Sequence, residues 1–313
     1  MISLEQIQKF FRLKPALNIS QIEKECGMPA RTLHRSLSDN KAIPSKYNPI
    51  LEDVLRQYGY TESTFENAVV ISIVNHKGGV GKTTTTINLG KALSLLNNKV
   101  LLIDMDSQGN LSQCYGIQQP EKQIIDALLD EEPLPIYPVA DNLFLSPSDI
   151  RMADRETELS SSVGAERRLS LKIHEIIKDF DYILIDCPPS LGICTISSLV
   201  ASNFCVIPMQ PEASAFHGVD NLFKRIKQVQ TFSNPSLRVK GIVFTMVLNQ
   251  NVHKGLMEEI REKYSFFNVY QTIIESSKYI RESQVMQQDL YTYNAKSASW
   301  EQYSNLANEI MTL

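Results

Sequence analysis

The sequence predicts a large α/β domain with a doubly wound, mostly parallel sheet, preceded by a small all-α domain. An apolar, mostly β-branched stretch at 69–74 runs through a glycine-rich loop into a helical pattern. Two further apolar stretches, 99–104 and 181–186, each end in an aspartate, and strand and helix patterns alternate to the end of the chain. We therefore expect one domain over residues 1–66 and a second over residues 67–313.

The composition is that of an ordinary globular protein. The chain has 313 residues, 43% hydrophobic and 21% charged, with a net charge of −4. Nucleic-acid binding would therefore need local basic patches. The five cysteines form no C-x-x-C pair, which is typical of reduced, mostly buried thiols in a cytosolic protein. No apolar run has the length of a membrane span and no signal peptide is evident, so we expect a cytoplasmic protein without membrane contact.

Residues 1–66 predict a helix-turn-helix. One helix has Ser20 as a plausible N-cap, Gly27 ends it, and a second helix starts at Pro29. The surrounding segment 12–46 is basic, which favours DNA binding. The residues expected to point outward from the second helix are Arg31, Thr32, His34, Arg35 and Ser36.

This pattern resembles the helix-turn-helix of phage-repressor-type regulators over roughly residues 17 to 60. Glu23 departs from it, because that position usually carries a small residue packed against the partner helix. The alternative is a small helical domain used for dimer or partner contacts. The polar segment 61–67 is predicted to be a linker.

The loop after strand 69–74 has the residues of a phosphate-binding loop. Glycines let backbone N–H groups approach phosphate oxygens, and the helix N-terminus adds a favourable field. Lys82 is placed to reach the β- and γ-phosphates and the Thr83 hydroxyl to bind Mg²⁺, so we expect ATP and Mg²⁺ as ligands. A chance glycine-rich turn is the alternative. The predicted nucleotide-binding residues here are Lys77, Gly78, Gly79, Val80, Gly81, Lys82, Thr83 and Thr84.

The loop departs from the standard pattern, because His76 replaces a glycine and a second lysine, Lys77, opens it. Lys-Gly-Gly-Val-Gly-Lys-Thr-Thr resembles the deviant P-loop of the ParA/MinD family of ATPases. The resemblance implies a P-loop NTPase fold, slow Mg²⁺-dependent ATP hydrolysis and a nucleotide-sandwich homodimer. In that dimer Lys77 would reach the partner's phosphates, so Lys77 and Lys82 are predicted catalytic residues.

Two strand ends supply acidic residues. Asp104-Met-Asp106-Ser-Gln-Gly-Asn110 resembles the second nucleotide motif of the family, with Ser107 in place of the usual proline. The resemblance implies that Asp106 orients or deprotonates the attacking water and that Asp104 supports the Mg²⁺ shell; a strand-end cap is the alternative for either acid. Strand 181–186 delivers Asp186 in a Walker-B arrangement. The predicted metal-binding residues are therefore Thr83, Asp104 and Asp186.

The other elements are predicted from periodicity and turn residues. After strand 203–208, Met209 and Pro211 open the loop where the family usually contacts adenine. Between 111 and 170 we expect a helix at 124–129, a proline-rich loop at 131–138, a strand at 142–147, a loop at 160–164 and a helix from 165. Later elements are helices at 216–230, 254–264 and 299–313 and a strand at 239–248.

The resemblance implies a ParA-type ATPase that partitions a plasmid or chromosome. It would be nucleoid-associated, bind double-stranded DNA without sequence preference as an ATP-bound homodimer, and be stimulated by a ParB-type partner. An ATP-switched transcriptional regulator or autorepressor is the main alternative. The C-terminal helix lacks the basic amphipathic character of a MinD-like membrane anchor. Candidate DNA contacts of the second domain, each also explained as an ordinary solvated face, are Lys224, Arg225, Lys227 and Lys254.

Overall fold

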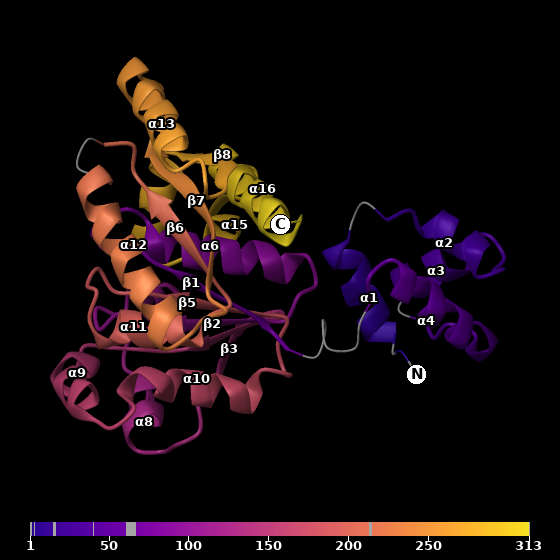
Figure 1. Cartoon of the computed structure of the whole chain (residues 1–313), viewed down its shortest axis with the longest axis horizontal. Coiled ribbons are helices and arrows are strands. Elements are labelled where there is room, and N and C mark those ends of the chain that lie inside the picture. Colours follow the sequence, from indigo (N-terminus) through magenta and orange to yellow (C-terminus); the bar gives the residue numbers. More distant parts are fainter. Residues whose placement is uncertain are drawn as a thin grey trace. The chain divides into compact units, whose positions relative to one another are not determined.

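A computed structural model describes residues 2, 4–14, 17–39, 41–60, 67–212 and 215–312. The chain divides into two compact units (Figure 1). The larger unit spans Ala68–Ile310, and the smaller is formed chiefly by residues up to Asn67. The predicted linker lies almost wholly in residues 61–66, which are outside the described residues.

The larger unit is built on one sheet of eight strands in the order β3-β4-β2-β5-β1-β6-β7-β8. All neighbouring strands pair in parallel except β3 and β4. This confirms the predicted mostly parallel α/β sheet. The strands are β1 (Val69–Ile73), β2 (Val100–Asp104), β3 (Tyr137–Ala140), β4 (Leu143–Ser146), β5 (Tyr182–Asp186), β6 (Phe204–Met209), β7 (Arg238–Val247) and β8 (Val269–Glu275).

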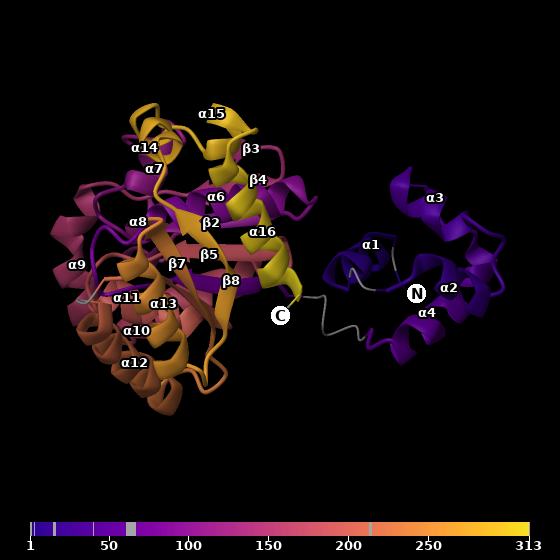
Figure 2. The ribbon, with the colours of Figure 1, turned by 90° about the horizontal axis from the view of Figure 1, so that it is seen from above.

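Helices cover both faces of this sheet (Figures 1 and 2). None of the helices in the described part of the chain is long and apolar enough to cross a membrane. On one face lie α8 (Ile124–Leu129), α9 (Arg151–Ser161), α10 (Ala165–Ile176), α11 (Ile193–Ala201), α12 (Ala215–Phe232) and α13 (Asn251–Lys263). The other layer contains α6 (Lys82–Leu95), α7 (Asn110–Cys114), α14 (Lys278–Val285), α15 (Leu290–Asn294) and α16 (Ala298–Thr312).

Helix α6 is buried nearly all round, because it lies between the sheet and the outer helices. Gly90 allows its close approach to β2, since a Cβ at this position would meet Leu102 Cδ2 at 2.5 Å. The close packing fixes the N-terminus of α6 at the carboxyl edge of the sheet, where ligands bind in doubly wound folds.

The smaller unit contains the helices α1 (Leu4–Leu13), α2 (Ile19–Glu25), α3 (Thr32–Ser38) and α4 (Asn48–Gln57) and the 3₁₀ turn Ser45–Tyr47. Phe10, Ile22, Leu33, Leu51 and Leu55 are buried in its core. Sequence periodicity did not predict α4, which supplies Leu51 and Leu55 to this core.

Two predicted helix boundaries in the smaller unit are wrong. The N-cap of α2 is Asn18, whose side chain accepts a hydrogen bond from the Gln21 N–H, and Ser20 lies inside the helix. Helix α3 begins at Thr32 rather than at Pro29, because Arg31 adopts a left-handed conformation with φ +64°. The first error arises because Asn18 and Ser20 both have capping side chains. The second arises because the N-cap residue of α3 makes no side-chain capping hydrogen bond that a local pattern could reveal.

In the larger unit, sequence periodicity missed β3, β8, α7, α9, α11, α14 and α15. The predicted loop 131–138 extends too far, since Tyr137 and Pro138 belong to β3. Proline is tolerated there because β3 is an edge strand. The predicted loop 160–164 starts too early, since α9 continues to Ser161. The five cysteines are buried and free, as predicted.

Candidate active site

The loop between β1 and α6 ends at Gly81, which has φ +83° and forms the N-cap of α6. Residues with a Cβ rarely adopt this conformation, so glycine is required at this position. The first N–H groups of α6 have no partner within the helix and border a pocket beside the loop. A helix N-terminus of this kind favours an anion such as a phosphate.

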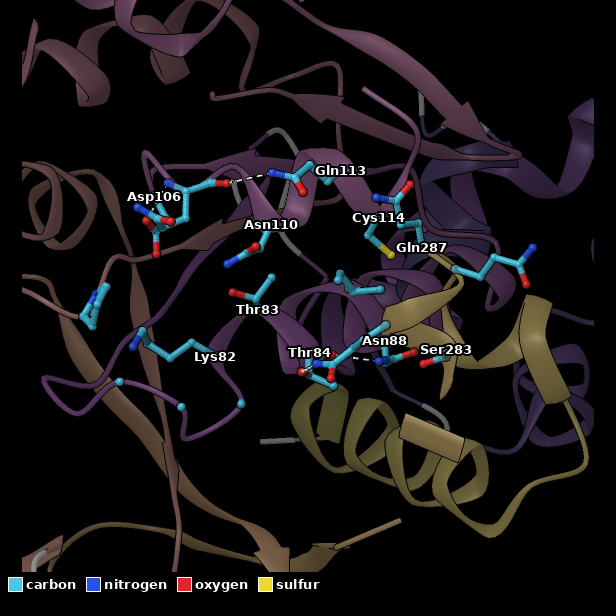
Figure 3. Close-up of a pocket in the computed structure, with 18 of the residues that line it drawn as sticks. Lys82, Thr83, Thr84, Asn88, Asp106, Asn110, Gln113, Cys114, Ser283 and Gln287 are labelled. Carbon is cyan, nitrogen blue, oxygen red and sulfur yellow. Dashed lines mark hydrogen bonds between the residues drawn. The ribbon is translucent and has the colours of Figure 1, made fainter. Parts of the chain in front are cut away.

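Lys82 projects alongside this loop (Figure 3). Its side chain is nearly buried, and its Nζ donates a hydrogen bond to the backbone oxygen of Lys77 at 3.1 Å. Burial lowers the pKa of Lys82, whereas the nearby carboxylates of Asp186 and Asp106 raise it. A bound phosphate would add to the raising effect, because it favours the charged ammonium.

The register of the sheet brings two aspartates together. Asp104 at the end of β2 pairs with Asp186 at the end of β5, and both side chains are fully buried. Burial raises the pKa of Asp104 to about 7. Burial, and then the Asp104 carboxylate, raise the pKa of Asp186 well above its usual value. Because these two carboxyl groups share one buried place, ionising both of them without a nearby cation costs free energy.

Asp104 uses both carboxylate oxygens within the protein. Its Oδ1 accepts a hydrogen bond from the Asp106 N–H at 3.1 Å. Its Oδ2 accepts from the N–H of Ser112 at 3.0 Å and from the Ser112 hydroxyl at 2.7 Å. Asp104 therefore holds the loop that carries Asp106, which is a positioning role.

Asp186 is less satisfied. Its Oδ1 accepts a hydrogen bond from the Thr86 hydroxyl at 3.3 Å. Its Oδ2 is buried and has no hydrogen-bond partner among the described residues. An open carboxylate oxygen of this kind suits a hard divalent cation. The described residues contain no group of three His, Cys, Asp or Glu side chains around a common point, so such a cation would need hydroxyl, phosphate or water oxygens as well.

Asp106 lines the same pocket as Lys82 and Thr83, and Figure 3 shows the three side chains facing a common space. It is half-buried, and its Oδ1 accepts a hydrogen bond from the Gln108 N–H at 3.0 Å. The predicted loop lysine, loop threonine and second-motif aspartate therefore come together at one site.

The pocket has a volume of about 580 Å³ and extends from the loop along α6 towards α7 and α14. Several predicted binding residues do not line it. Val80 and Met209 are almost fully buried, and Pro211 is buried as well. The predicted residues that do line it are Gly78, Gly79, Gly81, Lys82, Thr83, Thr84 and Asp106.

Sequence reasoning missed the far wall of the pocket. Met246 and the glutamines of α14 and the following turn line it, and Gln284 Nε2 donates to the Thr84 hydroxyl at 2.8 Å. Asn88 on α6 accepts a hydrogen bond from the Leu290 N–H at 2.8 Å. The run Gln284-Val-Met-Gln-Gln288 was the signal available in the sequence. This glutamine-rich run belongs to none of the nucleotide-binding motifs.

Lys77 lies outside the pocket lining and forms an ion pair with Glu212, in the loop after β6. Asn75 fixes the two loops to each other, because its Nδ2 donates to Pro208 O at 2.7 Å and its Oδ1 accepts from the Lys77 N–H at 3.0 Å. The ammonium of Lys77 is therefore held by a carboxylate of its own chain.

The proposed DNA-facing residues of α3 are only partly exposed. Arg31, His34 and Arg35 are exposed and Thr32 is half-buried. Ser36 is 5% exposed, so the prediction that it points outward is wrong. Its spacing of three residues from the buried Leu33 was the signal that it belongs to the inner face of the helix.

The contacts of Glu23 explain why this position departs from the helix-turn-helix pattern. It is buried, and its carboxylate accepts hydrogen bonds from the N–H groups of Arg31, Leu33 and His34 at 2.9, 2.8 and 3.1 Å. It therefore caps the N-terminus of α3 from the neighbouring helix, a role that a small residue lacks.

In the larger unit, Lys224, Lys227 and Lys254 are exposed, whereas Arg225 is half-buried and its Nη1 donates to Gln228 at 3.1 Å. Lys224 and Lys227 border a groove formed with the end of α13, and Lys254 lies near the start of that helix. The four predicted contacts therefore do not form one compact cluster.

The AAA_31 family, described as an AAA domain, matches residues 68–239. Sporulation initiation inhibitor protein Soj of Bacillus subtilis is 36% identical over 247 residues, covering 77% of this chain and 97% of Soj. Chromosome partitioning protein ParA of Myxococcus xanthus is 35% identical over 248 residues, covering 77% of this chain and 87% of that protein.

A solved structure is similar over the same share of the chain. Cobyrinic acid a,c-diamide synthase of Mycobacterium smegmatis, with a bound ATP analogue and magnesium, superimposes with a TM-score of 0.68 at 28% identity. The similarity covers 77% of this chain and 93% of that one. The family match thus covers the loop between β1 and α6 and the aspartates at the ends of β2 and β5.

Proposed function

The chain belongs to the AAA_31 family of P-loop ATPases, in the group that includes ParA and Soj, and we propose that it is a DNA-partition ATPase for a plasmid or chromosome. The observation that carries the proposal is the site itself. Lys82, Thr83 and Asp106 face one pocket beside a deviant phosphate loop. In this proposal the chain hydrolyses ATP slowly in the cytoplasm, on the nucleoid.

For hydrolysis, each residue has a separate task. Lys82 and the N–H groups at the start of α6 bind the phosphates and stabilise the charge that develops during transfer. Asp106 orients the attacking water or accepts its proton. Asp104 keeps Asp106 in place by accepting a hydrogen bond from the Asp106 N–H.

Magnesium fits the donors present at this site. The Thr83 hydroxyl and the open Oδ2 of Asp186 would hold it, directly or through water, with Asp104 in support. The ion supplies neutralisation of the phosphate charge. The Asp186 carboxyl is ionised more easily beside a cation, so metal binding and proton release are linked.

Dimerisation would change the group with which the Lys77 ammonium pairs. In the single chain its ammonium pairs with Glu212. In a nucleotide-sandwich dimer it would leave Glu212 and neutralise the phosphates bound to the second copy. Since a half-exposed ion pair is worth only about 0–1 kcal/mol, this exchange would cost little.

The ATP-bound dimer would bind double-stranded DNA through cations of the larger unit, with the exposed Lys254 and the half-buried Arg225 as candidates. A ParB-type partner would stimulate hydrolysis and release the DNA. Binding of this kind is electrostatic and weakens steeply with salt.

An ATP-switched transcriptional regulator is the second candidate function. The observation that favours it is the exposed side chains of Arg31, just before α3, and of His34 and Arg35 on α3, whose N-terminus Glu23 caps. In that case residues 1–66 would bind one operator sequence, and nucleotide would change only their affinity.

The test is binding to random-sequence duplex DNA with ATP, with ADP and without nucleotide, over a salt series. If the chain is a partition ATPase, it should bind the DNA strongly only when ATP is present. This binding should weaken as the salt concentration rises, and it should be lost in Lys82→Ala. Binding that ignores nucleotide, or that appears only with an operator fragment, would contradict the proposal and favour the regulator.

A further inference from the structure

A second concave site lies on the α12–α13 face of the larger unit and shares no lining residue with the nucleotide pocket. It is a groove of about 620 Å³ between α12, the end of α13 and the turn that leads into β8. Its size is in the range of sites that bind several side chains or a drug-sized ligand. Neither the ATPase reaction nor the DNA proposal uses its apolar floor.

The floor and one rim of the groove are aromatic. The rings of Phe223 and Phe267 stack with centroids 4.7 Å apart and planes at 19°. Phe266 packs on Phe267 with centroids 4.5 Å apart, yet its side chain is 72% exposed. Aromatic side chains that gather in an exposed groove are typical of interaction sites, because covering them removes apolar surface from water.

The charge around this floor is mainly positive. Lys263 is partly neutralised, because its Nζ lies 3.4 Å from Asp220 Oδ2, while the Tyr264 hydroxyl donates to the other oxygen at 3.1 Å. Lys224 and Lys227, on α12, are exposed and form no ion pair with any described residue. Three lysines against one aspartate favour a partner with negative charge.

We propose that this groove, lined by Phe223, Phe266 and Phe267 and bordered by Lys224 and Lys227, docks a short acidic segment of a partner protein. One or two aromatic or leucine side chains of the segment would cover the rings. Its carboxylates would lie beside Lys224 and Lys227.

Duplex DNA is the less suitable occupant. Its phosphates need cations but gain nothing from covering an apolar, aromatic floor, whereas a protein segment can supply both carboxylates and apolar side chains. The inference does not depend on the proposed partition function, since it rests on the groove alone.

The experiment selects peptides from a random phage-displayed library on the full-length protein and measures the affinity of the enriched peptides. The groove variants are Phe266→Ser and the double variant Lys224→Glu/Lys227→Glu. Matched controls are Phe232→Ser, a 79% exposed ring outside the groove lining, and the exposed Lys254→Glu. Circular dichroism and the ATPase rate check that each variant is folded.

We expect the enriched peptides to be acidic with at least one aromatic or leucine residue. Both groove variants should weaken binding by about tenfold or more, as for hot-spot residues, while both controls stay within about twofold of the wild type. Basic peptides, or peptides that bind Phe266→Ser and the wild type equally, would overturn the proposal. The proposal would also be overturned if the double lysine variant lost binding to random duplex DNA while none of the variants changed peptide binding.

Discussion

The ends of β2 and β5 carry aspartates that are adjacent in register and equally buried, yet their surroundings differ. Asp104 accepts three hydrogen bonds from the loop that follows it. Asp186 accepts one long hydrogen bond and keeps a buried oxygen without a described partner. A buried carboxylate with all its oxygens used is a structural group, and one with an open oxygen is suited to a ligand.

The largest expected effect is on catalysis in Asp186→Asn. Loss of the cation-facing oxygen should lower the ATPase kcat by roughly two to three orders of magnitude, as for other groups that stabilise transition-state charge. The fold should stay intact, because asparagine has nearly the shape of a carboxyl group that accepts only one long hydrogen bond from the described residues. Steady-state hydrolysis and urea unfolding would measure the two effects. A fall in stability as large as that of Asp104→Asn, measured in parallel, would remove the distinction between the two aspartates.

A smaller effect, on stability, is expected in Ser112→Ala. The Ser112 hydroxyl donates to Asp104 and accepts from the buried Ser148 N–H at 3.0 Å, so its loss leaves polar groups unsatisfied. The free energy of unfolding should fall by about 1–3 kcal/mol. Ser94→Ala is the matched control, because that hydroxyl only donates within its own helix, to Lys91 O. If urea unfolding gave equal losses of unfolding free energy in the two variants, the hydrogen bonds around Asp104 would add no more stability than a hydroxyl bonded within a helix.

The pH dependence of stability also tests the difference between Asp104 and Asp186. The folded-state pKa values of Asp104 and Asp186 are raised, so between about pH 4 and pH 7 the folded chain binds more protons than the unfolded chain. Their contribution to stability is therefore present at low pH and is lost as pH rises through the folded pKa. The urea midpoint of the nucleotide-free, magnesium-free protein should show this fall, and Asp186→Asn should show a shallower one. An equally steep fall in the variant would show that Asp186 does not titrate in this range.

The smallest expected effect is in Glu212→Gln, which removes the carboxylate that pairs with Lys77. Stability should change by less than about 1 kcal/mol, because the pair is only partly buried. The ATP concentration for half-maximal dimerisation should fall by up to about fivefold, which the same energy allows. Light scattering over an ATP titration measures it, and Glu258→Gln, on α13, is a suitable control. A rise in the required ATP would mean that Glu212 supports the dimer instead.

The sequence predicted those parts of the site in which local pattern and chemistry coincide. The glycine loop, Lys82, Asp104, Asp106 and Asp186 follow apolar strands, and parallel strands bring their carboxyl ends to one edge. The sheet class followed from the same alternation of strands and helices.

The rest depends on packing between distant segments. The Gln284 contact with Thr84 joins residues 200 positions apart, and no local pattern specifies it. Glu23 appeared only as a departure from a motif, although its carboxylate caps α3. The short strand β3 contains Pro138 and lies at the sheet edge, where strand propensity is a poor guide.

The most direct test of the division between the two aspartates is calorimetric binding of ATP with and without magnesium. The wild type and Asp104→Asn should bind ATP more tightly with magnesium, whereas Asp186→Asn should bind it equally in both buffers. If Asp186→Asn keeps the magnesium effect and Asp104→Asn loses it, the open oxygen of Asp186 is not the cation-facing group and the account is contradicted.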